Sequence, residues 1–174
     1  MIFILLSLQN NFSQNKDLPQ LVTVNRVDLK KYAGLWYEVA KIPNSFQDLC
    51  AYGTTAEYKI LQGGDIRVIN KCYEKDVKPD VAKGLAKVVD NKTNSKLKVS
   101  FFSILGIRPF WGDYWIIGLD DNYEWAVVGS PNRKYGWILS RTPSLPDETI
   151  QKIFALLKNQ NYNPYDFEMT IHKN

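Results

Sequence analysis

The sequence predicts an all-β fold in which eight antiparallel, up-and-down strands form a barrel or a sandwich, followed by one α-helix and a short final strand. Eight short segments alternate between apolar and polar residues, at intervals of about a dozen residues and with links of hairpin length. Near residue 144 the period changes to that of a helix. The chain has 174 residues, 45% of them hydrophobic, which corresponds to one domain with a sizeable core.

The first predicted strand begins at Gly34 and contains Trp36. Gly34 permits a close approach of the backbone, and the large apolar body of Trp36 is not expected on an exposed edge. Trp36 is therefore either an ordinary core residue or a plug at one end of a closed barrel. If Trp36 points inward, the two-residue period of a strand places Glu38 and Ala40 inward as well.

Seven further strands follow in order, separated by turn signals such as Gln-Gly-Gly-Asp at 62–65, which favours a hairpin. These strands cover residues 51–61, 66–73, 81–90, 96–101, 114–119, 123–129 and 135–141. An irregular apolar loop at 104–112 separates the fifth strand from the sixth.

The helix is predicted to start with Ser144 as its N-cap and Pro146 in its first turn. The helix is predicted to end within 159–164, because Pro164 cannot continue a helix. The last strand is predicted at 167–171, where apolar residues alternate. The helix carries one apolar stripe for packing against the sheet, formed by Ile150, Ile153, Phe154 and Leu157.

The start of the chain predicts export. Residues 2–8 form an apolar run of signal-peptide length that is too short to span a bilayer, and a polar stretch follows at 9–16. We therefore interpret 1–16 as a signal peptide with a linker and 17–174 as the folded domain. No cysteine directly follows the apolar run, so the sequence offers no site for a lipoprotein anchor there.

The chain contains two cysteines, Cys50 and Cys72. In an exported protein an even number of cysteines favours a disulfide, which would contribute roughly 3 kcal/mol in the loop-entropy model. The alternative is a pair of unrelated buried thiols. Neither cysteine belongs to a spacing typical of a metal site.

The net charge is +4, and the basic residues are spread along the chain. Such a distribution gives no electrostatic footprint for nucleic acid, although weak attraction to an anionic membrane surface is compatible with it.

Small residues recur on the faces expected to point inward, and a solid core would favour Leu, Ile and Val at these positions. The small residues are Ala40, Thr54, Ala56, Ala82, Gly84, Ala86, Gly118 and Gly129. We therefore predict a ligand cavity. Its predicted contact residues are Glu38, Ala40, Phe46, Tyr58, Asn70, Phe101, Tyr114, Trp125 and Trp137.

Two of these contacts are polar, and the open end is expected to be aromatic. Glu38 and Asn70 would hold an ordered water or the polar head of a ligand, or would bond to each other, because leaving them unpaired in an apolar interior is costly. Phe46, Phe110 and Trp111 lie on the long loops. Exposed aromatic residues there suit ligand entry, a membrane contact or a dimer interface.

Three local motifs, in order, resemble those of the lipocalin family: Gly34-x-Trp36, Asp121-Asn122-Tyr123 and Arg141 at the end of the eighth strand. The second motif departs from the family pattern at its first two positions. The resemblance runs from about 27 to 171 and implies a closed barrel with Gly34, Trp36, Tyr123 and Arg141 as structural residues. Longer stretches resemble the bacterial outer-membrane lipocalins and apolipoprotein D, namely residues 34–40, 68–70, 97–102 and 137–143.

In a closed barrel the eighth strand neighbours the first, which places Arg141 near Trp36. We therefore predict that its guanidinium lies over the indole, a cation–π contact worth roughly 0.5–2 kcal/mol.

The resemblance implies binding, storage or transport of a small hydrophobic ligand, such as a fatty acid, lysophospholipid or phospholipid. It also implies a location in the cell envelope, either in the periplasm or at the outer-membrane surface, or secretion. The protein would be a monomer or homodimer, with a possible peripheral membrane contact.

No catalytic residue, cofactor or metal is predicted. The single histidine, His172, is the third-last residue, and the sequence contains no Gly-x-Ser-x-Gly or His-Glu-x-x-His motif. A haem site would need an axial histidine inside the barrel. The alternatives are a lipid- or isoprenoid-modifying enzyme on the same barrel, for which Glu38 is the clear acidic candidate, and an interaction protein with a filled barrel.

Overall fold

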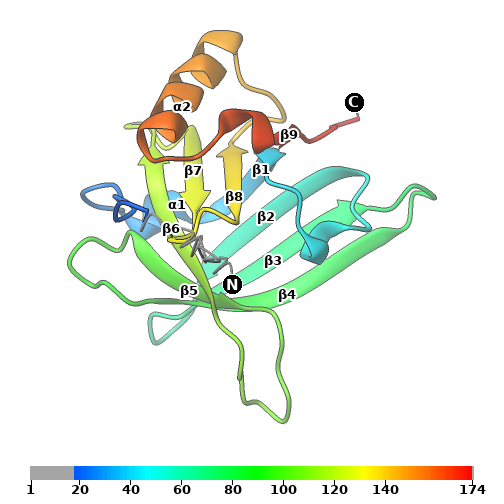
Figure 1. Cartoon of the computed structure of the whole chain (residues 1–174). Coiled ribbons are helices and arrows are strands. Elements are labelled where there is room, and N and C mark those ends of the chain that lie inside the picture. The colour runs from blue at the N-terminus through cyan, green and yellow to red at the C-terminus, as the bar shows by residue number, and fades with distance from the viewer. Residues whose placement is uncertain (1–17, 174) are drawn as a thin grey trace, which may run out of the picture.

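A computed structural model describes residues 18–173, in which eight antiparallel strands close into a barrel (Figure 1). The strands are β1 (Gly34–Lys41), β2 (Tyr52–Ile60), β3 (Ile66–Tyr73), β4 (Pro79–Val88), β5 (Lys96–Ser100), β6 (Gly112–Leu119), β7 (Trp125–Gly129) and β8 (Gly136–Ser140). Each strand pairs with the next, and β1 pairs with both β2 and β8. The predicted fold class is confirmed, and the barrel, not the sandwich, is the correct alternative.

The links between the strands alternate between the two ends of the barrel. One end carries the links 61–65, 89–95 and 120–124 together with a single helical turn, α1 (Leu29–Tyr32), which the sequence analysis did not predict. The carboxylate of Asp28 caps this turn by accepting hydrogen bonds from the backbone N–H groups of Lys30 and Lys31. The other end carries the longer loops 42–51 and 101–111, with a short 3-10 helix, η1 (Ser45–Gln47), in the first of them.

Trp36 and Arg141 seal the end of the barrel next to α1. Trp36 is fully buried, and the Arg141 guanidinium carbon lies 3.7 Å from the centroid of its ring, which confirms the predicted contact. The Trp36 indole N–H donates to the carbonyl of Tyr32 at 2.8 Å. The Arg141 guanidinium donates to the backbone carbonyls of Lys31, Tyr32, Ala33, Leu35 and Tyr123.

Gly34 and Tyr123 complete this seal. Gly34 has a φ of +97°, a conformation that other residues rarely adopt. The Tyr123 hydroxyl accepts a hydrogen bond from the backbone N–H of Asp28 at 2.8 Å. The four residues predicted to be structural therefore meet at one end of the barrel.

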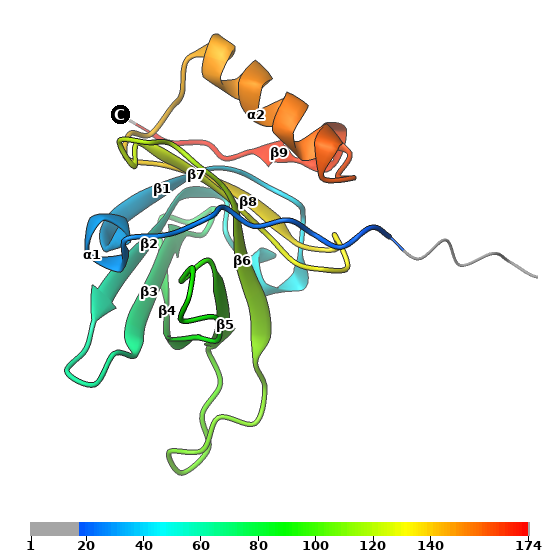
Figure 2. The same ribbon diagram turned by 90° about the vertical axis from the view of Figure 1, so that its left-hand side faces the viewer.

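Helix α2 (Asp147–Asn159) lies across the outside of the barrel, over the strands β7, β8 and β1 (Figure 2). Ile153 and Leu157 are fully buried against this wall. The helix begins one residue after Pro146, which is its N-cap, so the predicted N-cap Ser144 is wrong. The residue before a proline is disfavoured in the helical region, which explains why α2 does not reach back to Leu145.

The segment after α2 differs from its prediction in two respects. Helix α2 ends at Asn159, within the predicted range, with Gln160 as its C-cap, and Pro164 starts a short 3-10 helix, η2 (Pro164–Asp166), that was not predicted. The final strand, β9 (Glu168–Met169), has only two residues and pairs with β1 outside the barrel. Phe167 is buried, whereas Met169 and Ile171 are exposed.

Three small residues predicted to line the cavity face outward instead. The register of β1 shifts between Glu38 and Ala40, which turns Ala40 toward the layer under α2. A second shift in β6 turns Gly118 outward, where an added Cβ would lie 2.9 Å from Leu156 Cδ1. Gly129 makes room for the Tyr162 hydroxyl. These residues allow the C-terminal segment to pack closely.

The predicted disulfide joins Cys50 to Cys72 and is confirmed, with the two Cα atoms 5.4 Å apart. It ties loop 42–51 to the end of β3. Within 18–173, the helices are too short or too polar to cross a bilayer. The predicted export signal at 1–16 lies outside the described residues.

Candidate functional site

The barrel encloses a cavity of about 860 Å³ that opens at the end carrying the longer loops. Its volume lies in the range of about 300–1,000 Å³ that is typical of small-molecule sites. The deeper wall is apolar and comes from several strands, with Ile66, Val68, Ala86, Leu97, Ile116 and Leu139 among its residues. The barrel is therefore hollow between the Trp36 seal and the open end.

Most of the predicted contact residues line this cavity. They are Glu38, Phe46, Tyr58, Asn70, Phe101, Tyr114 and Trp137. Ala40 and Trp125 do not line it, because both lie in the layer between the barrel and α2. In β7 the alternate residues Ala126 and Val128 belong to the inner core, which leaves Trp125 outside, with Lys152 Nζ 5.8 Å from its ring centroid.

Glu38 is buried, at 4% exposure, and forms the centre of a hydrogen-bond network at the open end. Its carboxylate accepts from Gln47 Nε2 and from Thr170 Oγ1, each at 2.7 Å. Lys41 Nζ lies 3.5 Å away. The Gln47 side chain in turn accepts from the Trp137 indole N–H at 3.0 Å. Glu38 thus ties η1 and the C-terminal segment to β1.

The network explains why the two predicted polar contacts do not bond to each other. Glu38 is already bonded to its neighbours, whereas the side-chain oxygen of Asn70 is buried without a hydrogen-bond partner in the described part of the chain. Because Asn70 lines the cavity, this oxygen can accept a hydrogen bond from a molecule inside it.

Three tyrosines form a second polar group, at the closed end of the cavity. Tyr114 Oη lies 2.7 Å from Tyr32 Oη and 2.9 Å from Tyr58 Oη. Burial raises the pKa of all three phenols, and it raises that of Tyr58 to about 12. These side chains therefore stay protonated at neutral pH.

Sequence reasoning missed Tyr32 and Gln47. Both lie outside the regular strands, on α1 and η1, so the two-residue alternation gave no signal for them. The proximity of Tyr32 to the Gly34-x-Trp36 motif was the available hint, because that motif marks the closed end.

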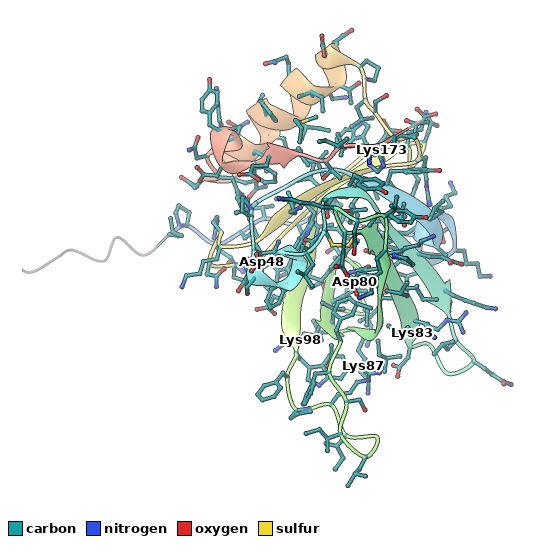
Figure 3. All side chains as sticks on the ribbon, turned by 90° about the vertical axis from the view of Figure 1, so that its right-hand side faces the viewer. Asp48, Asp80, Lys83, Lys87, Lys98 and Lys173 are labelled. Carbon is teal, nitrogen blue, oxygen red and sulfur yellow. A yellow bond between two sulfur atoms is a disulfide. The ribbon has the colours of Figure 1, made fainter. Side chains whose placement is uncertain are left out.

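The open end is apolar, and Phe46 and Phe110 are exposed there as predicted, whereas Trp111 is half-buried and its indole N–H donates to the Arg108 carbonyl at 2.8 Å. The loop 101–111, here called the mouth loop, projects from the barrel wall (Figure 1). Its apolar side chains are largely exposed, Leu105 at its tip by 97% and Phe110 by 69%. Seen from this end, Lys83, Lys87 and Lys98 lie on the strands next to the mouth loop (Figure 3).

A cluster that resembles a metal site is explained by the disulfide. Cys50, Cys72 and Asp80 lie within 4.8 Å of one another. Because the two sulfurs are bonded to each other, they are not available as thiolate ligands. This cluster does not support a metal site.

An eight-stranded barrel with an apolar cavity that is open at one end is typical of the class of β-barrels that hold a small molecule in their interior. The family model of the lipocalin-like domain matches residues 27–172. The chain therefore belongs to the lipocalin family.

Individual relatives agree with this assignment. The outer membrane lipoprotein Blc of Escherichia coli K12 is 38% identical over 151 residues, which cover 86% of this chain and 82% of the relative. Apolipoprotein D of Rattus norvegicus is 37% identical over 142 residues, covering 77% and 71%. The structure of insecticyanin from the tobacco hornworm has a TM-score of 0.72 at 22% identity, covering 90% and 86%, and shows the shared fold.

Proposed function

We propose that this protein binds and carries a small, elongated, apolar ligand in its barrel, with fatty acids, lysophospholipids and phospholipids as the ligand class. The observation that carries this proposal is the apolar cavity, which is sealed at one end and open at the other. Burying each methylene group gains about 0.8 kcal/mol. An acyl chain can therefore be held reversibly without specific chemistry.

The cost of burying a charge favours one orientation of such a ligand. Lys71 contributes to the wall toward the open end, but its ammonium group lies 4.8 Å from the centroid of the Tyr73 ring, which is outside the cavity. The acidic residues Asp80 and Asp113 line the same end, so the charge there is mixed. A charged head group keeps its hydration if it stays at the mouth while the acyl chain points inward.

The proposed location is outside the cytoplasm, in the periplasm, at an outer-membrane surface, or secreted. The disulfide fits an oxidising compartment. The name of the Escherichia coli relative includes the words outer membrane lipoprotein, and the apolar run at 2–8 fits an export signal.

We also propose that the mouth loop contacts a lipid surface during ligand exchange. Its exposed residues Ile104, Leu105 and Ile107 offer an apolar tip, and Lys83, Lys87 and Lys98 stand nearby. An apolar tip beside cationic residues suits an anionic membrane interface. Pairing of two copies through the same loop is the alternative, and sedimentation of wild type and Leu105→Asp would separate a monomer from a homodimer.

The carrier proposal is tested by ligand recovery and by blocking the cavity. Native mass spectrometry of protein purified from cells should show a bound lipid, and a fluorescent fatty acid should bind to the delipidated protein. Ala82→Trp, which projects into the cavity, should weaken that binding at least tenfold. Lys83→Trp, on the outer face of the same strand, is the matched control. A delipidated wild type that binds no fatty acid would refute the proposal.

The enzyme alternative receives no support from the cavity. It requires an acid–base pair, and the clear acidic candidate is Glu38, whose two carboxylate oxygens are bonded to Gln47, Thr170 and Lys41.

A further inference from the structure

The deepest polar feature of the cavity is the cluster of Tyr32, Tyr58 and Tyr114, here called the phenol floor. The three side chains come from α1, β2 and β6, so they converge from separate parts of the barrel. Tyr32 also packs against the Trp36 seal, with ring centroids 5.0 Å apart. All three residues line the cavity. A ligand that fills the barrel to its closed end therefore ends against phenolic hydroxyl groups.

The phenol floor has more hydrogen-bonding capacity than it uses. Three hydroxyl groups offer three donors and up to six acceptor positions. They form two hydrogen bonds with one another, through the central Tyr114, and no others with residues 18–173. One O–H donor and several acceptor positions are consequently left for a group inside the cavity.

The remaining donor is neutral and stays available. Burial raises the pKa of each phenol above its ordinary value, so the hydroxyl groups keep their protons at any physiological pH. Arg141, the cation whose charge acts on the Tyr32 phenol, lies against the Trp36 ring and is bonded to backbone carbonyls of the seal. It does not line the cavity, so a buried carboxylate would find no direct cationic partner on the floor.

We propose that the phenol floor binds a neutral oxygen, a hydroxyl or carbonyl group, at the buried end of the ligand. This inference rests on the proposed carrier function and narrows its ligand class. The favoured ligand is an elongated apolar molecule that has an oxygen at its leading end and keeps any charged head at the mouth. Asn70, whose unpaired oxygen lies on the wall between the floor and the mouth, accepts a second hydrogen bond from a ligand hydroxyl along the chain.

A purely structural role makes a different prediction. If the three tyrosines only stabilise the closed end, their hydroxyl groups affect stability but not the preference between two ligands that differ only at the buried end. A polar end group that enters a cavity floor without a hydrogen-bonding partner weakens binding by roughly tenfold or more. The terminal group of the ligand is therefore the variable to test.

The experiment compares hexadecanoate with 16-hydroxyhexadecanoate by competition against a bound fluorescent fatty acid. The two ligands share the carboxylate and the chain length and differ in one terminal hydroxyl. The proteins are wild type, Tyr114→Phe and the triple variant Tyr32→Phe/Tyr58→Phe/Tyr114→Phe, which removes all the hydroxyls and leaves none unpaired. Tyr73→Phe is the matched control, because Tyr73 lies outside the cavity and its hydroxyl makes no hydrogen bond with the described residues.

Wild type and Tyr73→Phe should bind the hydroxylated ligand at least as tightly as hexadecanoate. In the triple variant the ratio of the two dissociation constants should shift by roughly tenfold against the hydroxylated ligand. Each ratio is measured within one protein sample, so a variant that folds less completely still reports its preference. An unchanged ratio with intact hexadecanoate binding overturns this inference alone, whereas absent binding of both ligands to wild type overturns the carrier function and this inference together.

Discussion

Replacing Arg141 with alanine tests how the closed end of the barrel is held. The substitution removes a cation–π contact of about 1 kcal/mol with the Trp36 ring. It also removes several hydrogen bonds to backbone carbonyls, including those of Leu35 and Lys31 at 2.6 and 2.7 Å. Because Arg141 is partly exposed, water replaces some of these bonds, and we count two of them at about 1 kcal/mol each. The expected loss in the free energy of unfolding is therefore about 3 kcal/mol.

Urea unfolding, followed by far-UV circular dichroism, measures this loss. In thermal unfolding the same loss lowers Tm by roughly 6–12 °C for a chain of this size. Arg141→Lys keeps the charge but not the planar fork of donors, so it should recover less than half of the lost stability. Arg67→Ala, on the exposed outer face of β3, is the control and should change stability by less than about 0.5 kcal/mol. If Arg141→Ala unfolds like that control, Arg141 does not hold the seal. Ligand preference should be nearly unchanged in the folded variant, because Arg141 does not line the cavity.

Three further outcomes are expected. Burial raises the pKa of the phenol-floor tyrosines in the folded state, to about 12 for Tyr58. Their contribution to the free energy of unfolding is therefore complete below about pH 10 and is lost as the pH rises through these folded-state pKa values. Urea midpoints at pH 9 and 11 should therefore diverge more in wild type than in the triple phenylalanine variant, and equal divergence contradicts the prediction. Replacing Cys50 and Cys72 by serine should lower the free energy of unfolding by roughly 3 kcal/mol, measured in urea, and a loss below 1 kcal/mol would show that the bridge contributes little. Leu105→Asp at the tip of the mouth loop should reduce co-sedimentation with anionic vesicles several-fold, while Val89→Asp at the opposite end of the barrel should not. Equal effects of the two substitutions would exclude the mouth loop as the site of membrane contact.

The contact between residues at the closed end could be predicted from the sequence because it depends on only one inference, the closure of the barrel. The resemblance to lipocalins implied a closed barrel, and closure makes the last strand a neighbour of the first. Once this is accepted, the glycine and tryptophan at one end of β1 and the arginine that follows β8 must lie together. The contact between Trp36 and Arg141 follows from topology alone and does not depend on exact register.

The outward-facing residues could not be predicted in this way. In β7 all the residues from Trp125 to Gly129 are buried, since the cavity core covers one face and α2 the other. A strand buried on both faces shows no alternation, so its parity cannot be read from hydrophobicity. In β1 the register shift after Glu38 reverses the parity for Ala40, and a bulge of this kind leaves no clear mark in a single sequence.

The phenol floor was inaccessible to sequence reasoning for a third reason. Tyr58 and Tyr114 were expected as separate wall residues, but their joint property depends on Tyr32 reaching them from α1. Sequence separations of 56 and 82 residues link these hydroxyl pairs, and no local pattern encodes such a meeting. Only the closed barrel turns three ordinary tyrosines into one polar group.

The two ends of the barrel together determine how a ligand is recognised. Trp36 and Arg141 block the closed end, so a ligand enters and leaves through the end that carries the mouth loop. A molecule with one charged end enters with its uncharged end first, because burying a charge without a partner is far more costly than burying methylenes. That leading end is the part that reaches the phenol floor. The protein should therefore discriminate between ligands by the chain end opposite to the head group. Two lipids with the same head group but different chain ends should bind with different affinities.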